Sequence, residues 1–323
     1  MTKVPVAFIC DSHFVIPTAV AITSLICNKN PNTYYDIYII AVDLSEMEMK
    51  KFYEFKGGKA NVHIIEASLE KYEDMQQYGL VNSTTYLKFD LPDLIPDQDK
   101  VLYLDGDIVI QKDLSDLFGI NIKDYYAGAV KSIVMIDNAL NLKKYFFSGV
   151  MLLNLKLMRE NNTSTALLNI GRSVDKLKFM DQDCFNILFD NKVKFLPIIY
   201  DCPYNLFLKY RDKYTLDYIN KYYETNYLSF ENIKNDSYII HFAGHEKPWT
   251  YFDVGSASEW DEYFKNSPYK NHELKRRSKK VREFMVSRNL TKLSYFFFMH
   301  WRYHSFRFAM GKVRNKLFNN GNE

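Results

Sequence analysis

The chain has 323 residues, of which 47% are hydrophobic and 25% are charged, and its formal net charge at pH 7 is +3. This length and apolar content support a full hydrophobic core, in one large domain or two ordinary ones, and indicate a globular protein. No segment reaches the roughly 18 uninterrupted apolar residues of a membrane-spanning helix, which argues against an integral membrane protein.

The first half of the chain alternates apolar runs with helical patterns. Val4–Cys10 predicts a buried strand, and the short apolar run that Asp11 ends is a poor match to a signal peptide. Pro17 is placed to open a helix over residues 17–30. A second buried strand is predicted over residues 34–42.

The pattern continues through residue 110. A helix is expected over residues 44–55, with Ser45 and Glu48 as a capping box. A third strand is expected over residues 60–67. A helix capped by Ser83 is expected over residues 83–95, and a fourth strand over residues 101–110. This alternation predicts an α/β fold with a Rossmann-like, mostly parallel central sheet flanked by helices on both faces.

After Gly128 the pattern becomes more mixed. Strands are expected over residues 126–130, 148–155, 192–197 and 237–244, with a helix over residues 182–190. No repeat, low-complexity tract or linker precedes residue 265, so one catalytic domain is predicted over residues 1–265. Cys10, Cys27, Cys184 and Cys202 are scattered without a C-x-x-C pair, and we expect reduced thiols in apolar surroundings, in a reducing compartment.

Two aspartates with one glycine between them follow the apolar run 101–104. In an extended segment residues i and i+2 point the same way, so Asp105 and Asp107 can present two carboxylates to one divalent cation. Gly106 would let another group approach the backbone closely. By itself the pattern more often marks solvated acids at the end of a strand than a cation site.

The segment "HFAGHEKPW" supplies groups that complement the aspartates. His241 ends a predicted strand, Gly244 permits a turn, and Lys247 offers an ammonium group. Each is ordinary alone, but with two aspartates they provide what a nucleoside diphosphate and its cation require. A mixed Asp/Asp/His set favours Mn²⁺ over Mg²⁺, which remains possible, because imidazole suits softer transition ions.

Five ordered motifs carry a family resemblance: "STTYLKFDL", "DKVLYLDGDIVI", "SGVMLLNL", "MDQD" and "HFAGHEKPW". Over roughly residues 4–250 the chain resembles the retaining glycosyltransferases of family 8, which include bacterial lipopolysaccharide galactosyl- and glucosyltransferases and glycogenin. The resemblance implies a GT-A fold, a UDP-sugar donor, Mn²⁺, and retaining transfer of galactose or glucose to a glycan or glycolipid acceptor, such as lipopolysaccharide or another lipid-linked surface glycan.

The resemblance also implies roles for individual residues. Asp105, Asp107 and His241 match the metal ligands, and Asp181 and Gln182 match the catalytic pair that faces the donor sugar. The remaining donor-binding positions are Ile9, Asp11, which would read uracil, His13, Lys88, Gly106, Ser148, Gly244, His245 and Lys247. Two departures, His13 and Phe147 where Asn or a small polar residue is common, leave the donor open.

Because the sugar's far face would meet the amide of Gln182 rather than an obvious carboxylate, front-face attack through a short-lived ion pair is favoured over double displacement.

A basic, aromatic segment ends the chain. Residues 270–316 carry 14 Lys or Arg and 2 Glu, interleaved with Phe, Trp and Tyr. We interpret residues 266–323 as an amphipathic segment that binds an anionic membrane surface, which would place the protein in the cytoplasm at the inner face of the plasma membrane. Nucleic-acid binding, which we consider unlikely, and a packed helix with a solvated basic face are the alternatives.

Three other functions were weighed. "LDGDIV" also fits the nucleophile loop of haloacid-dehalogenase-type phosphohydrolases, but no suitable acidic pair follows residue 107. A sugar-nucleotide pyrophosphorylase would need a Gly-rich loop after the first strand, and "CDSHFVIP" has none. A non-catalytic nucleotide-sugar-binding protein remains an alternative.

Overall fold

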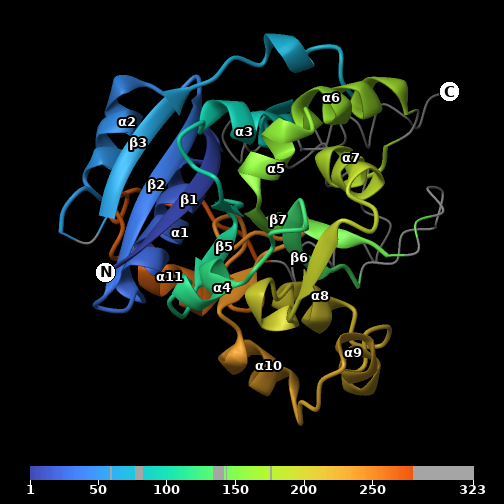
Figure 1. Cartoon of the computed structure of the whole chain (residues 1–323). Helices are drawn as coiled ribbons and strands as arrows, with labels where there is room; N and C mark the ends of the chain where they lie inside the picture. Colours follow the sequence, from blue (N-terminus) through green and yellow to red (C-terminus); the bar gives the residue numbers. More distant parts are fainter. Residues whose placement is uncertain (59, 77–82, 134–141, 143, 175–176, 279–323) are drawn as a thin grey trace, which may run out of the picture. The chain divides into compact units, whose positions relative to one another are not determined.

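The computed structural model describes residues 1–58, 60–76, 83–133, 142, 144–174 and 177–278 (Figure 1). Its contacts divide the chain into two units. One contains Met1–Lys247 and Gly255–Glu273, and the other contains Pro248–Val254 and the chain from Leu274 onward. The predicted boundary at residue 265 stays a prediction.

The strands are β1 (Thr2–Asp11), β2 (Thr33–Val42), β3 (Ala60–Glu66), β4 (Val101–Leu104), β5 (Ile108–Ile110), β6 (Ala127–Lys131), β7 (Phe146–Leu153), β8 (Val193–Leu196) and β9 (Ile239–His241). The α-helices are α1 (Val15–Cys27), α2 (Glu46–Tyr53), α3 (Leu91–Leu94), α4 (Ser115–Gly119), α5 (Leu155–Glu160), α6 (Thr163–Ser173), α7 (Met180–Leu188), α8 (Tyr204–Lys209), α9 (Leu216–Tyr223), α10 (Phe230–Asp236) and α11 (Ala257–Phe264). The 3₁₀ helices are η1 (Glu70–Tyr72), η2 (Ser83–Asp90) and η3 (Ile198–Tyr200).

The first unit is built on a seven-stranded sheet in the order β3-β2-β1-β4-β7-β6-β8 (Figure 1). All neighbouring pairs are parallel except the two that β7 makes with β4 and β6. The prediction of a mostly parallel sheet is therefore confirmed. The chain builds from β1 toward β3 and then returns to β4 on the other side of β1, so β1 and β4 flank the point where ligands bind in such sheets.

Helices cover both faces of this sheet. Along β1, Val6 and Phe8 alternate with Ala7, and all three are fully buried, so both faces are packed. Ala7 belongs to the large core that also contains Tyr86 of η2 and Phe185 of α7. On the opposite face α1 packs against β1 and α11.

Residues 101–110 were predicted as one strand, and this is wrong. The chain leaves the large sheet after β4 and enters a second, two-stranded sheet as β5, which pairs antiparallel with β9. Asp105, Gly106 and Asp107 form the bend between the two strands. Both strands are fully buried and apolar, so the prediction ran a single strand through the three residues between them.

The predicted α-helix over residues 83–95 also differs from the structure. Its first part is the 3₁₀ helix η2, and only α3 is α-helical, with Pro92 in its first turn. In a 3₁₀ helix residues i and i+3 lie in line, and Tyr86 and Phe89 contact each other in the core in this way, with tilted rings whose centroids are 5.5 Å apart. Aromatic packing here outweighs the α-helical pattern.

The structure also tests the predictions for the capping box and for the cysteines. The capping box of Ser45 and Glu48 forms as predicted at the start of α2. All four cysteines are free, but Cys27 is exposed, which corrects the expectation of apolar surroundings for all of them. Cys27 is exposed because it lies in the last turn of α1, past the helix's buried stretch.

In the second unit Tyr251 bridges Arg277, and Phe252 N–H donates to the Arg277 carbonyl oxygen at 3.1 Å. Within the described residues, the helices are all too short or too polar to cross a membrane. Most of the predicted membrane-binding segment, residues 279–323, lies outside the described residues.

Candidate active site

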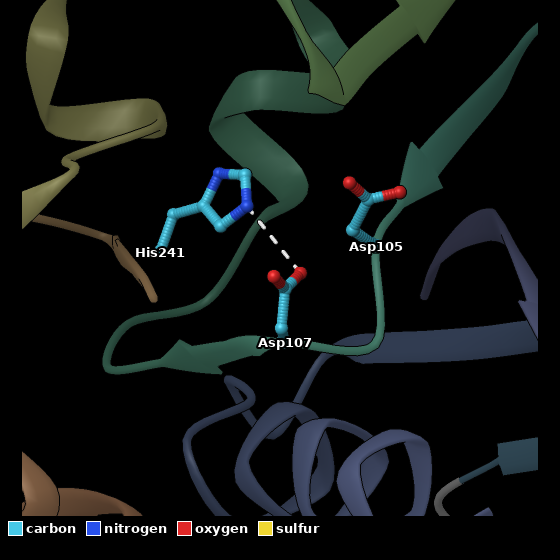
Figure 2. Close-up of side chains that lie close together, drawn as sticks. All are labelled: Asp105, Asp107 and His241. Carbon is cyan, nitrogen blue, oxygen red and sulfur yellow. Dashed lines mark ion pairs between the residues drawn. The ribbon is translucent and has the colours of Figure 1, made fainter. Parts of the chain in front are cut away.

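Two aspartates and a histidine from distant parts of the chain meet where β4 ends (Figure 2). Asp105 and Asp107 come from the bend after β4. His241 ends β9, which pairs with β5 so that His241 lies opposite Ile108, the residue after Asp107. One oxygen of each carboxylate and one imidazole nitrogen all lie within 4.8 Å of one another. The sheet pairing thus brings together side chains about 135 residues apart in sequence.

Charge neutralisation dominates the electrostatics of this cluster. Burial raises the pKa of Asp107, but Lys247 and His241 outweigh it and hold that pKa well below its usual range. Burial lowers the pKa of His241, yet Asp107 and Asp201 raise it to about 10. The pKa of Asp105 is raised, first by burial and further by Asp107, against the opposing effect of Lys88.

These residues fit a divalent cation. Carboxylate oxygens and an imidazole nitrogen are ligands that Mn²⁺ and similar ions accept. His241 Nε2 lies 3.3 Å from Asp107 Oδ1, so the ring nitrogen and the carboxylate already point at one locus. A bound cation would displace the proton from Nε2 of His241, because an imidazole nitrogen that binds a metal cannot carry a proton.

A second group of side chains surrounds Asp181, which is 5% exposed. Asp181 Oδ2 accepts hydrogen bonds from Lys88 Nζ at 2.8 Å and Ser148 Oγ at 2.9 Å, and Oδ1 accepts one from Thr85 Oγ1 at 2.5 Å. Thr85 and Lys88 are three residues apart on η2, so the 3₁₀ geometry aims both at one carboxylate. Lys88 Nζ also lies 3.2 Å from Asp105 Oδ1, which links the two groups.

Gln182 follows Asp181 at the start of α7 and is held from two sides. Its Oε1 accepts from the backbone N–H of Ser148 at 3.1 Å, and its Nε2 donates to the Tyr145 hydroxyl at 3.1 Å. Tyr145 in turn donates to Asp183 at 2.6 Å. The amide is therefore fixed in orientation beside the β7 strand.

Two glycines allow the backbone to approach these side chains. A Cβ on Gly149 would lie 2.4 Å from His241 Cε1 and 2.8 Å from Asp105 Oδ2, closer than real atoms come. A Cβ on Gly106 would lie 2.5 Å from Thr18 Oγ1 and 3.2 Å from the Phe14 ring. Gly149 therefore leaves the space that His241 and Asp105 occupy, and Gly106 leaves the space that Thr18 and Phe14 occupy.

Lys247 connects the segment after β9, residues 242–247, to the aspartates. It pairs with Asp107 Oδ2 and donates to the Phe242 carbonyl oxygen at 2.7 Å. Gly244 has a φ of +82°, which suits glycine, and it is exposed, as is His245. The structure thus brings Lys247 into the cluster and leaves Gly244 and His245 at the surface of the turn.

Asp11, the predicted uracil-reading residue, ends β1. Asp11 Oδ1 accepts from the backbone N–H groups of His13 at 2.9 Å and Phe14 at 3.1 Å, so this carboxylate holds the turn that leads into α1. His13 is exposed, and Ile9 is partly buried within β1. Phe14 lies against Gly106, so the turn adjoins the cluster, while the role of Asp11 remains a prediction.

Several side chains of the site were not predicted: Thr85, Tyr103, Tyr145, Gly149 and Asp201. Tyr103 donates to Asp105 Oδ1 at 2.6 Å, and Asp201 Oδ1 lies 2.8 Å from His241 Nδ1. A glycine inside the apolar run of β7 is the signal that could have found Gly149. Asp201 follows an apolar run as the other acids do, but no motif distinguishes it.

Lys88 is expected to be essential for stability as well as for the site. Replacing it with methionine would leave the Asp181 carboxylate buried without its counter-charge, a loss that typically costs about 3–5 kcal/mol. Urea unfolding monitored by circular dichroism measures the change. Lys51→Met is the control, because the Lys51–Glu54 pair is exposed and worth less than about 1 kcal/mol. Equal losses in the two variants would contradict the buried ion pair.

The fold is that of the GT-A glycosyltransferases. Galactosyltransferase LgtC, solved in complex with donor and acceptor sugar analogues, has a TM-score of 0.67 to this structure at 23% identity, over 81% of this chain and 96% of that one. The apo structure of the bifunctional glycosyltransferase WbbM has a TM-score of 0.69 at 22% identity, over 83% of this chain and 50% of that one. The predicted fold class is confirmed.

The chain belongs to Glycosyl transferase family 8, whose family model matches residues 5–253. Lipopolysaccharide 1,2-glucosyltransferase of Escherichia coli is 28% identical over 288 residues, which cover 84% of this chain and 80% of that protein. General stress protein A of Bacillus subtilis (strain 168) is 26% identical over 261 residues, covering 74% and 88%. The predicted family is therefore confirmed, and with it the general class of glycosyl transfer.

Proposed function

We propose that the protein transfers a hexose, galactose or glucose, from a UDP-sugar to a glycan acceptor with retention at the anomeric carbon. The observation that carries this is the Asp105, Asp107 and His241 cluster at the end of β4, backed by Lys247. Such a cluster at the switch point of a parallel sheet is suited to a nucleoside diphosphate and its cation. Family membership supplies the transfer chemistry.

Asp105, Asp107 and His241 would hold the cation, for which we favour Mn²⁺ over Mg²⁺. Bound there, it would neutralise the charge that develops on the departing diphosphate. Lys247 forms an ion pair with Asp107 and would contribute a second positive charge beside the departing diphosphate. With two sources of positive charge at the leaving group, no separate general acid is required.

Asp181 and Gln182 would face the donor sugar. Asp181 accepts three hydrogen bonds, from Thr85, Lys88 and Ser148, which suits a positioning role better than attack on carbon. Gln182 is an amide, a weak nucleophile, and its orientation is fixed. We therefore favour attack of the acceptor hydroxyl on the face that the diphosphate leaves, with the proton passing to the phosphate oxygen.

The acceptor is proposed from the relatives. The Escherichia coli relative is named as a lipopolysaccharide 1,2-glucosyltransferase, so lipopolysaccharide or another lipid-linked surface glycan is the acceptor we favour. A lipid-linked acceptor agrees with the proposed membrane-binding segment at residues 266–323 and with a cytoplasmic protein held at the inner face of the plasma membrane.

Of the alternatives, a phosphohydrolase has no support, since the chain belongs to a transferase family. A non-catalytic protein that binds nucleotide sugars would use the same cluster. It differs from the proposal in one measurable property, which is turnover of the donor.

A thermal-shift panel with UDP-galactose, UDP-glucose and UDP-N-acetylglucosamine, each with and without Mn²⁺, tests the proposal. A bound donor stabilises the folded state by mass action, so one hexose donor should raise Tm by more than the others, and only with the cation. Release of UDP should follow for that donor, and NMR of the product should show a retained anomeric configuration. Stabilisation without UDP release would support the binding protein, and no cation dependence would refute the proposal.

A further inference from the structure

We propose that Asp201 is a positioning residue that fixes the tautomer and ring orientation of His241 so that Nε2 faces the cation. This inference rests on the proposed cation site. The carrying observation is a direct contact: Asp201 is fully buried, and its Oδ1 lies 2.8 Å from His241 Nδ1.

The backbone holds Asp201 in place against β9. The next residue, Cys202, bridges Ile240, and its N–H donates to the Ile239 carbonyl oxygen at 3.1 Å. In return His241 N–H donates to the Cys202 carbonyl oxygen at 2.9 Å. These two backbone hydrogen bonds hold the chain next to Asp201 against β9. They thereby align the Asp201 carboxylate with the His241 ring.

The chemistry of the pair determines which ring nitrogen is available. An ionised carboxylate only accepts hydrogen bonds, so Nδ1 must carry the proton that joins it to Asp201. A neutral ring then has its lone pair on Nε2, the nitrogen that lies 3.3 Å from Asp107 Oδ1. Metal-binding histidines are commonly oriented by a carboxylate on the second nitrogen, which also makes them stronger ligands.

The second oxygen of Asp201 argues against a purely structural role. Among the described residues, Asp201 Oδ2 is buried and has no hydrogen-bond partner. Burying a charged oxygen without a partner is costly, and asparagine could accept the same bond without the charge. We therefore attribute the presence of a carboxylate, rather than an amide, at this position to its effect on the His241 imidazole.

The chain contains a matched pair outside the site. Asp36 is 2% exposed, and its Oδ1 also lies 2.8 Å from a histidine nitrogen, His63 Nε2. Asp36 additionally pairs with Lys3, so its charge is compensated by an ammonium group. Removing the charge of Asp36 should disturb folding in a comparable way without reaching the cation site.

The test measures Mn²⁺ affinity without any donor, by titration calorimetry, for the full-length wild type, Asp201→Asn, Asp201→Ala and Asp36→Asn. We expect Asp201→Ala to weaken Mn²⁺ binding by about 10- to 100-fold and Asp201→Asn by less, since the amide oxygen can still accept the bond. Asp36→Asn should bind Mn²⁺ as the wild type does. Nitrogen-15 NMR with saturating Mg²⁺, which is diamagnetic, should show His241 protonated on Nδ1 alone in the wild type, whereas Asp201→Ala at the same Mg²⁺ concentration should keep a proton on Nε2 in part of the molecules.

Two results would overturn the inference. If the wild type binds Mn²⁺ and both Asp201 variants bind it equally well, Asp201 has no positioning role, while the cation site stands. If the wild type binds no divalent cation, the proposed function fails and this inference with it. Should Asp201→Ala melt below the assay temperature, Asp201→Leu decides, because it keeps a similar volume and offers no acceptor: unchanged affinity together with an unchanged distribution of protons on the His241 ring rejects the role.

Discussion

Replacing Asp107 by asparagine is expected to remove tight Mn²⁺ binding and, with it, transfer from the UDP-sugar. Asp107 is 7% exposed and pairs with both His241 and Lys247. The amide keeps the volume but brings no negative charge to the cation, and even outer-shell partners of a metal are worth about 10- to 100-fold in affinity. Loss of a direct ligand should exceed that range, as measured by calorimetric titration with Mn²⁺ and by the rate of UDP release.

Asp113→Asn is the matched control for this variant. Asp113 is 8% exposed and belongs to a separate cluster, where it accepts hydrogen bonds from the Asn30 backbone N–H at 2.8 Å and from Thr33 Oγ1 at 3.1 Å. The Asp113→Asn variant should have a lower Tm than the wild type and an unchanged affinity for Mn²⁺. An Asp107→Asn enzyme that binds Mn²⁺ and turns over donor like the wild type would show that the aspartate pair is not the cation site.

The parts of the fold that were predictable share one physical property. Strands of a parallel sheet covered on both faces appear as continuous apolar runs, and β1 and β2 do so. The change of sheet at Gly106 could not be found in this way, because β5 is as buried and apolar as β4, and hydropathy does not show that the two strands belong to different sheets. Hydropathy reports burial, and here both sides of a bend are buried in different sheets.

The same reasoning explains which site residues could be found. Asp105 and His241 end buried strands, where polar residues in such folds gather at one edge, so the sequence alone could place them together. Asp201 reaches His241 only because Cys202 bridges Ile240. No local pattern encodes that pairing. The contact of Thr85 with Asp181 depends on the 3₁₀ form of η2, whereas the sequence pattern favoured an α-helix.

Gly149→Ala is expected to disable the site through packing alone, without changing any charged group. The added methyl would lie 2.4 Å from His241 Cε1 and 2.8 Å from Asp105 Oδ2, so the ring and the carboxylate must both move away. Gly149 also accepts a hydrogen bond at its carbonyl oxygen from the Asp105 N–H at 2.7 Å, which ties the backbone to the aspartate and limits relaxation. Overpacking of this kind costs about 1–3 kcal/mol of stability, and Mn²⁺ affinity should fall with it.

Gly128→Ala separates overpacking in the sheet from damage to the site. Gly128 lies in β6, and the atoms nearest to its added methyl would be Leu196 Cδ2 at 3.3 Å and Ile122 Cγ2 at 3.4 Å, which are tight contacts without overlap. These can shift by a few tenths of an ångström, so Gly128→Ala should retain wild-type Mn²⁺ affinity and most of its stability in urea unfolding. If Gly149→Ala also bound Mn²⁺ with wild-type affinity, the cation could not sit between Asp105 and His241, because the methyl group forces those two side chains apart.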